Sequence, residues 1–235
     1  TYRIMGGEAL SRWYHPERGL LSPGAFVPML EREGLICKLD YYCLRCACRF
    51  LQTLLERGEE HFFLSCNFSR ETFAAPDFAQ RCKAIMEEYR FPRELLIFEL
   101  TESASVRCLG QIRDNMLALK EYGVRIALDD FGEGFTCFAD LQQYPVDGIK
   151  LDKGLIEYIA TKNGNAVVRA MVQAGHELGL TILAEGVEQQ AQVQALQQMH
   201  CDVIQGFRFH APMPAAECLD QILARQPGVV PQVRL

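Results

Sequence analysis

Two adjacent carboxylates, Asp129 and Asp130, end a short apolar run that begins at Val124. An apolar run bounded by turn residues is typical of a strand that is covered on both faces, as in a parallel sheet flanked by helices. Neighbouring negative charges repel each other and are costly to desolvate, so this position requires compensation by cations or hydrogen bonds. A divalent metal ion is one such compensation. In the alternative interpretation, Asp129 caps the following loop and Asp130 is simply solvated.

Polar side chains recur at the ends of other apolar runs along the chain. In chain order they are Glu8, Asn67, Glu99, Glu102, Asp129, Asp130, Lys150, Asp152, Glu185, Glu188 and Gln205. Because the carboxyl ends of parallel strands meet at one edge, we expect these side chains to line one rim of a sheet. Carboxylate and amide oxygens at such a rim predict a site for a hard divalent cation.

The elements that must position these residues alternate between strands and helices. Strands are expected at residues 2–10, 62–66, 95–98, 124–128, 146–149, 181–184 and 203–204, and helices at 38–57, 78–89, 109–122, 165–178, in a segment from about 23 and in one through 196. Alternating strands and helices predict βα units with right-handed crossovers. At 235 residues, closure into an α/β barrel is the natural architecture.

Composition limits the function classes. The chain has 49% hydrophobic residues and a formal net charge of -6 without a basic run, which argues against non-specific binding to a nucleic acid polymer or an anionic membrane. The sequence contains no apolar stretch of transmembrane length and no signal-peptide layout, so we expect a soluble domain without direct membrane contact. Because Thr1 lies inside a strand-like segment, we expect a longer parent protein.

The ten cysteines are expected to be free thiols in a reducing compartment, because those in apolar runs lack regular spacing. Cys46 and Cys48 form a CxC pair, but no second pair or histidine cluster completes a zinc site.

The motifs together resemble the EAL-domain family of bacterial cyclic di-GMP phosphodiesterases. The matching positions are Glu8-Ala9-Leu10 with Arg12-Trp13, Asn67, Glu99 to Glu102, Asp129 to Gly132, Lys150 to Asp152, Glu185 to Glu188, and Gln205-Gly206. The resemblance runs from about residue 2 to Pro214. It implies one domain over residues 1–225 with a loose tail at 226–235, and a modified TIM barrel whose first strand is antiparallel to its neighbours.

The resemblance also implies hydrolysis of the second messenger cyclic di-GMP to linear pGpG with Mg²⁺ or Mn²⁺, often as two ions. Glu8, Asn67, Glu99 and Asp129 would hold one ion, and Asp129, Asp130 and Glu185 the second. Glu8, Lys150, Glu185 and Gln205 would serve catalysis, Leu10, Arg12 and Asp152 would bind substrate, and Glu102 would hold the loop after Asp130.

Several of these residues also have ordinary structural interpretations. Lys150 could form a salt bridge with a carboxylate of the rim, and Arg12 could be a surface arginine beside Trp13. Gln205 could be a turn residue, or it could position Lys150 or the attacking water. Glu102 could be an acid at a helix N-terminus, where the helix dipole favours negative charge.

The loop after Asp130 departs from the family pattern, because Glu133, Gly134, Phe135, Thr136 and Cys137 occupy its positions. This loop leaves open a receptor module that binds cyclic di-GMP without cleaving it. A barrel hydrolase for another phosphodiester is a further alternative, because it would use the same ligands and differ only in the pocket. The family further implies a cytoplasmic domain, fusion to sensory or GGDEF-type domains, and a homodimer.

Overall fold

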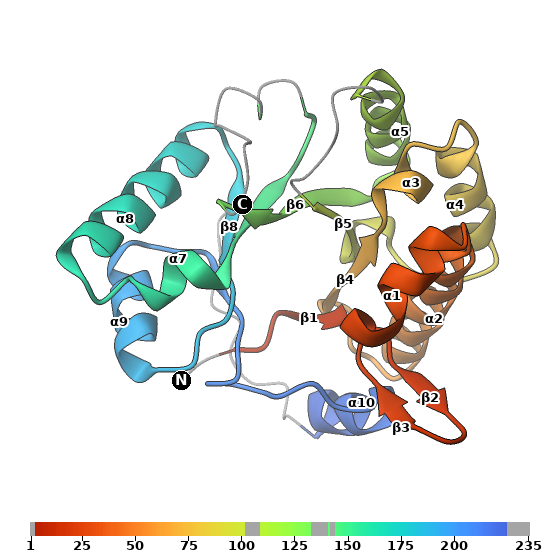
Figure 1. Cartoon of the computed structure of the whole chain (residues 1–235), viewed down its shortest axis with the longest axis horizontal. Helices are drawn as coiled ribbons and strands as arrows, with labels where there is room; N and C mark the ends of the chain where they lie inside the picture. The colour runs from red at the N-terminus through yellow and green to blue at the C-terminus, as the bar shows by residue number, and fades with distance from the viewer. Residues whose placement is uncertain (1–2, 102–108, 133–140, 142–143, 225–235) are drawn as a thin grey trace.

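The structure is a computed structural model that describes residues 3–101, 109–132, 141 and 144–224. Its centre is a curled seven-stranded sheet in the order β1-β4-β5-β6-β7-β8-β9, in which every neighbouring pair is parallel (Figure 1). The strands are β1 (Gly6–Ala9), β4 (Phe63–Phe68), β5 (Leu96–Thr101), β6 (Arg125–Phe131), β7 (Gly148–Leu151), β8 (Thr181–Ala184) and β9 (Val203–Ile204). This architecture confirms the predicted TIM-type α/β barrel.

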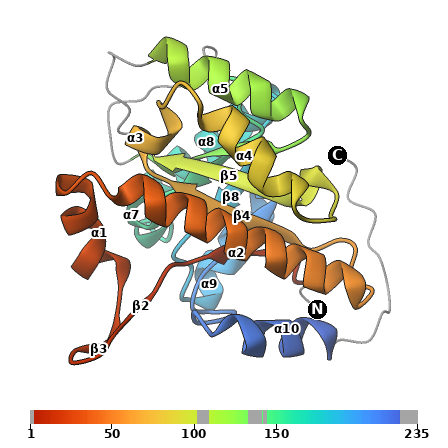
Figure 2. The same cartoon turned by 90° about the vertical axis from the view of Figure 1, so that its right-hand side faces the viewer.

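Helices surround the sheet. They are α1 (Pro23–Arg32), α2 (Ile36–Glu56), α3 (Arg70–Phe73), α4 (Phe78–Glu87), α5 (Leu109–Glu121), α7 (Lys153–Glu157), α8 (Lys162–Glu177), α9 (Gln190–Gln198) and α10 (Ala215–Leu223), with a 3₁₀ turn η1 at Arg93–Leu95. Figure 2 shows α2, α4 and α5 side by side over one part of the sheet. Most apolar residues of the strands from β4 to β8 are buried in the hydrophobic core beneath the helices, which explains why these runs are apolar.

The direction of the first strand was predicted wrongly. β1 runs parallel to β4, with Gly6 opposite Phe63 and Glu8 opposite Ser65. The physical reason lies in Glu8: since it stands near the carboxyl end of β1, a parallel strand is what brings it to the same rim as Asn67. Gly6 permits the close pairing, because a Cβ atom there would lie 2.4 Å from the carbonyl oxygen of Phe63.

The structure contains short elements that periodicity did not predict. An antiparallel hairpin of β2 (Trp13–His15) and β3 (Gly19–Leu21) follows β1. The short helices α3 and α7 begin directly after strands, and α10 covers one end of the molecule in Figure 1. Ser22 occupies the N-cap position of α1, but its side chain makes no capping hydrogen bond.

The thiols agree with the prediction for the part of the chain that is described. All eight cysteines in that part are free, and burial raises the pKa of Cys48 to about 12. No helix in the described ranges combines the length and apolar composition of a membrane span. The tail at 226–235 lies outside the described residues.

Candidate active site

The carboxyl ends of the strands bring the predicted residues together at one rim. Register places Asn67 on β4 opposite Glu99 on β5. The others lie at the ends of their strands, in the order Glu8 on β1, Asp129 and Asp130 on β6, Lys150 on β7, Glu185 after β8 and Gln205 after β9. Residues that are far apart in sequence therefore share one site because parallel strands end on the same side.

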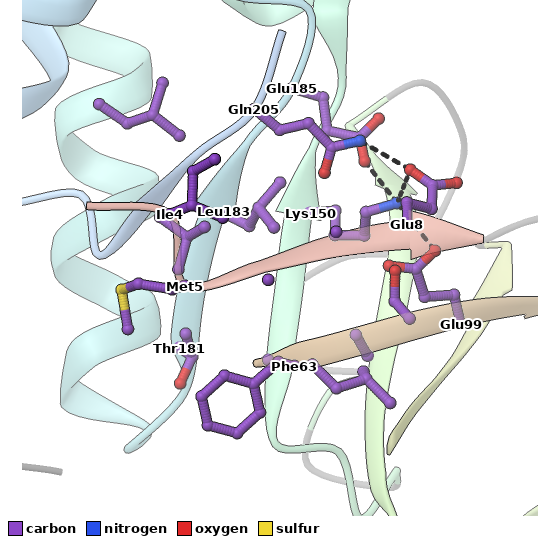
Figure 3. Close-up of a pocket in the computed structure, with 18 of the residues that line it drawn as sticks. Ile4, Met5, Glu8, Phe63, Glu99, Lys150, Thr181, Leu183, Glu185 and Gln205 are labelled. Atoms are coloured by element: carbon purple, nitrogen blue, oxygen red, sulfur yellow. Dashed lines mark hydrogen bonds and ion pairs between the residues drawn. The ribbon is translucent and has the colours of Figure 1, made fainter. Parts of the chain in front are cut away.

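Lys150 is the centre of this site. Its Nζ atom lies 3.0 Å from Glu99 Oε2 and 3.5 Å from Glu8 Oε2, and it also pairs with Glu185 (Figure 3). Asp129 Oδ1 lies 3.0 Å from the same atom. The lysine side chain is only 2% exposed. An ammonium group among carboxylates at these distances offsets part of their mutual repulsion.

Two amides hold the carboxylate of Glu8. Asn67 Nδ2 donates to Glu8 Oε1 at 2.6 Å, and Gln205 Nε2 donates to Glu8 Oε2 at 2.7 Å. Gln205 therefore contacts Glu8, whereas the sequence suggested Lys150 or a water as its partner. Because Asn67 donates through its nitrogen, its carbonyl oxygen stays available as a ligand for a cation.

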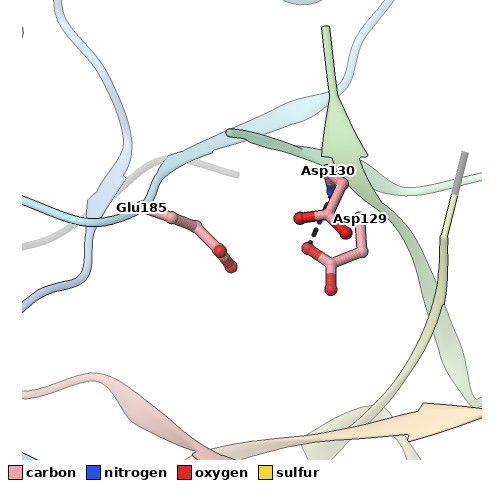
Figure 4. Close-up of side chains that lie close together, drawn as sticks. All are labelled: Asp129, Asp130 and Glu185. Atoms are coloured by element: carbon pink, nitrogen blue, oxygen red, sulfur yellow. Dashed lines mark hydrogen bonds between the residues drawn. The ribbon is translucent and has the colours of Figure 1, made fainter. Parts of the chain in front are cut away.

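Asp129, Asp130 and Glu185 form a second acidic group. One oxygen from each lies within 4.8 Å of the others, and Figure 4 shows the two aspartates of β6 facing Glu185. The backbone NH of Asp130 donates to Asp129 Oδ1 at 2.9 Å. Asp130 has a φ of 55° and lies where the β6 to β7 register shifts, between Leu128 and Phe131. This irregularity lets two consecutive residues contribute to one site.

Burial dominates the electrostatics of the site. It raises the pKa of Glu99 to about 8 and that of Glu185 to about 7, although Lys150 opposes both shifts. Burial alone would lower the pKa of Lys150, but the surrounding carboxylates, Glu99 first, raise it above its usual value. The lysine therefore carries a proton, while the two glutamates exchange protons near neutral pH.

The donor set fits a divalent metal ion. The buried oxygens Glu99 Oε2 and Glu185 Oε1 both lie against the Lys150 ammonium, and carboxylate oxygens that face one cation in this way can also face a metal ion. All ligands predicted from the sequence are oxygen donors, which suit Mg²⁺ and Mn²⁺. The six predicted ligand residues are gathered at one rim, as the preceding contacts show.

The rim opens into a cavity of about 2780 Å³ inside the curled sheet. Glu8, Glu99, Lys150 and Glu185 line it, together with the exposed side chains of Leu10 and Arg12. The Arg12 guanidinium donates to the carbonyl oxygen of Ser11 at 2.7 Å. The same cavity reaches Asp147, Thr181 and Asp202 at the amino ends of the strands, so its volume is that of the whole interior of the curled sheet and not of the rim alone.

Two further predictions have different outcomes. Asp152 is the N-cap of α7, where its Oδ1 accepts from the NH of Gly154 at 2.6 Å, so the described contact is structural. Glu102 and the loop from Glu133 to Cys137 lie outside the described residues.

Sequence reasoning missed the neighbour that holds the segment after β8. Lys153 Nζ lies 2.9 Å from Glu188 Oε1, and a Cβ atom on Gly186 would lie 2.4 Å from Lys153 Cγ. The lysine stem therefore lies against the residue that follows Glu185. The only sequence signal for this contact was the position of Lys153 directly after Lys150-Leu151-Asp152.

Comparison with known proteins identifies the family. A family model described as EAL domain matches residues 1–212. The chain belongs to the EAL domain family. This finding confirms the resemblance that the sequence motifs indicated.

Two curated relatives of this EAL domain come from Pseudomonas aeruginosa. MucR, named a bifunctional diguanylate cyclase/cyclic di-GMP phosphodiesterase, is 34% identical over 93% of this chain and 32% of its own length. NbdA, named a cyclic di-GMP phosphodiesterase, is 32% identical over 97% of this chain and 29% of its own length. The chain spans about a third of the length of these relatives.

A solved structure supports the same assignment. The structure titled "PaMucR Phosphodiesterase, c-di-GMP complex" has a TM-score of 0.84 and 35% identity, and the match covers 90% of this EAL domain and 86% of that chain. The fold of the two domains is therefore the same modified TIM-type barrel.

Proposed function

We propose that this EAL domain hydrolyses cyclic di-GMP to linear pGpG in a reaction that depends on Mg²⁺ or Mn²⁺, with two ions bound. The observation that carries the proposal is the convergence of Glu8, Glu99, Asp129 and Glu185 on Lys150 at the mouth of the cavity. The named activities of MucR and NbdA support cyclic di-GMP as the substrate.

The ligands fall into two sets that share Asp129. Glu8, Asn67, Glu99 and Asp129 form the first set, and Asp129, Asp130 and Glu185 form the second. A pair of divalent ions held there would supply a hydroxide nucleophile and stabilise negative charge on the phosphate oxygens. The second set is the acidic group whose oxygens lie within 4.8 Å of one another.

The remaining residues of the site have roles that follow from their contacts. Lys150 keeps its proton and provides a fixed positive charge for the phosphate in the transition state. Gln205 and Asn67 orient Glu8 through its two oxygens. Arg12 and Leu10 lie on the cavity wall, where the guanidinium suits a phosphate of the substrate. For Asp152 and Glu102 we keep the proposed roles of substrate contact and loop support.

The proposed setting is a cytoplasmic, homodimeric domain within a longer protein that also carries sensory or GGDEF-type domains. The length of the curated relatives, of which this chain spans about a third, supports the longer protein.

The test is turnover of cyclic di-GMP by the purified domain in Mg²⁺, in Mn²⁺ and in EDTA. Glu8→Gln removes a charged ligand but keeps the shape of the side chain, and we expect it to lower kcat by at least ~100-fold. Glu87→Gln is the matched control, because Glu87 is exposed on α4, outside the site.

Metal-dependent formation of pGpG by the wild type and the control, but not by Glu8→Gln, would support the proposal. Binding of cyclic di-GMP without cleavage under every metal condition would overturn it in favour of a receptor. Cleavage of simple mononucleotide diesters at a similar rate would instead indicate a hydrolase with another substrate.

A further inference from the structure

Asp40 is a buried carboxylate on α2, outside the set of proposed ligands. It is 6% exposed. Its Oδ2 atom accepts three hydrogen bonds, from the NH of Ser69 at 3.0 Å, from Ser69 Oγ at 2.7 Å and from Thr72 Oγ1 at 2.5 Å. No lysine, arginine or histidine in the described ranges forms an ion pair with it. Burial of a carboxylate costs free energy, because the group loses its hydration. The three hydrogen bonds to Asp40 compensate for part of this cost.

The three bonds fix the turn that follows β4. Ser69 is the N-cap of α3 and comes directly after the last residue of β4, and its Oγ accepts from the NH of Thr72 at 3.2 Å. Phe68, the last residue of the strand, packs against Phe73 and Phe98 in the core. The carboxyl end of β4 is therefore held by α2 through Asp40 and by the core through Phe68.

This end of β4 carries Asn67, two residues before Ser69. Asn67 Nδ2 donates to Glu8 Oε1 at 2.6 Å, and Asn67 pairs with Glu99 across the sheet. A shift of the turn would move the amide of Asn67 relative to both carboxylates. Three donors of the turn converge on one oxygen of Asp40, so removal of this side chain would leave three donors without that acceptor.

We propose that Asp40 is a positioning residue of the metal site. By holding Ser69, it fixes the position of the Asn67 amide relative to the Glu8 carboxylate. The inference rests on the proposed function, since it assigns a role toward the metal ions. Residues that orient ligands without touching the metal ion typically change metal affinity by about 10–100-fold when they are removed.

A purely structural role would have a different consequence, and Asn115 provides the comparison. Asn115 on α5 is 4% exposed and donates to the carbonyl oxygens of Phe73 at 2.8 Å and Ala75 at 2.9 Å. It holds the same connection between β4 and α4, but farther along the chain from Asn67. Loss of either side chain should lower thermal stability, whereas only the loss of Asp40 should disturb the metal site.

The experiment is calorimetric titration of the EDTA-treated and dialysed domain with MnCl₂, at a temperature where each variant is folded by circular dichroism. Asp40→Ala should weaken Mn²⁺ binding by at least ~10-fold. Asp40→Asn keeps an acceptor oxygen and should stay within about threefold of the wild type, and Asn115→Ala within about twofold.

Equal Mn²⁺ affinities of Asp40→Ala and Asn115→Ala would overturn the inference. If Asp40→Ala does not fold, Ser69→Ala decides in its place: a Mn²⁺ affinity about threefold or more below that of Asn115→Ala supports the inference, and an equal affinity overturns it. Absence of Mn²⁺ binding by the wild type would overturn the proposed metal site itself, and the inference with it. The two failures are therefore distinguishable.

Discussion

Lys150 compensates part of the negative charge of a cluster of buried carboxylates. Four carboxylates lie within 3.5 Å of its Nζ atom, and one positive charge compensates only part of theirs. The remaining charge is met in two ways: protons on Glu99 and Glu185, whose pKa values are raised, and, in the proposed function, divalent ions. Protons, the ammonium group of Lys150 and the proposed metal ions thus compensate the negative charge of the same carboxylate oxygens.

Removal of the lysine should therefore make stability depend strongly on metal. Lys150→Met leaves the carboxylates without their buried cation, and we expect the free energy of unfolding in EDTA to fall by about 3 kcal/mol. Mn²⁺ in large excess should restore about 2–3 kcal/mol, because it binds the folded state alone. Denaturant melts with and without Mn²⁺ measure both effects. Lys153→Met, at a side chain that is 50% exposed, is the control, and an equally stable Lys150→Met in EDTA would contradict the prediction.

The raised pKa values predict that metal binding depends on pH. Glu99 and Glu185, with pKa values of about 8 and about 7, hold protons in the folded state that an unfolded chain has already lost. Without metal, this contribution to stability is present at low pH and is lost as the pH rises through about 8. Metal ions need the carboxylate form, so Mn²⁺ affinity should rise between about pH 6 and pH 8, with release of protons.

Titration with Mn²⁺ in two buffers of different ionisation enthalpy measures this proton release directly. A binding enthalpy that is the same in both buffers at pH 7 would show that the two glutamates are already ionised before the metal ion arrives.

At the scale of elements, the amino ends of the strands repeat one arrangement. Asp147, just before β7, accepts from the NH of Ile126 on β6 at 2.9 Å and from Lys120 on α5 at 2.6 Å. Asp202, just before β9, accepts from the NH of Ile182 on β8 at 2.8 Å and lies 2.9 Å from His176 on α8. In both cases the aspartate ties the start of one strand to the preceding strand and helix.

These aspartates should support the fold without serving the site, because they lie at the rim opposite to Lys150. Asp147→Ala and Asp202→Ala should each lower the free energy of unfolding by about 1.5–3 kcal/mol, the value of a hydrogen bond from a backbone NH to a charged acceptor. Turnover and Mn²⁺ affinity of the folded variants should equal those of the wild type. Thermal melts and the cyclic di-GMP assay provide both readouts. A loss of activity without a loss of stability would contradict the assignment of these aspartates to the fold and not to the site.

The elements that the sequence predicted well are those with strong apolar patterns. The runs at 181–184 and 203–204 coincide with β8 and β9, since a short apolar run bounded by turn residues is the pattern of a strand in a parallel sheet. The hairpin of β2 and β3 gave no such signal, because Tyr14 is 79% exposed and Leu20 is 66% exposed, so neither strand has a buried face. Strand ends were also misjudged: Glu99 and Asp129 lie within β5 and β6 rather than after them.

The site itself was predicted as a set of residues but not as a set of contacts. Rim positions follow from the ends of apolar runs, whereas the choice of the proposed ligands among them came from the resemblance to the EAL-domain family. Which amide holds which carboxylate depends on the curl of the whole sheet, and the Gln205 to Glu8 hydrogen bond joins residues 197 positions apart. The positive φ of Asp130 likewise depends on the register shift between β6 and β7 rather than on local sequence.

At the scale of the whole molecule, the curl brings the first and last strands of the sheet near each other. β1 and β9 are its two edges, and the hydrogen bond from Gln205 to Glu8 connects them at the rim. The backbone of Gln205 is itself held, because its NH donates to Ala184 at 2.8 Å and its carbonyl oxygen accepts from Val187 at 3.0 Å. Gln205 therefore ties β1 to the last two strands.

Loss of this connection should loosen β1 locally. Gln205→Leu keeps a side chain of similar size but cannot donate to Glu8, and a hydrogen bond to a charged acceptor contributes about 1.5–3 kcal/mol. We expect amide hydrogens of Gly6 to Ala9 to exchange roughly tenfold faster or more, while those of β5 and β6 keep their rates. Hydrogen exchange measured by mass spectrometry tests this, with Gln194→Leu on the exposed face of α9 as the control. Equal acceleration in every strand would mean that Gln205 supports the fold as a whole, and an unchanged β1 would mean that its pairing with β4 suffices to hold Glu8 in place.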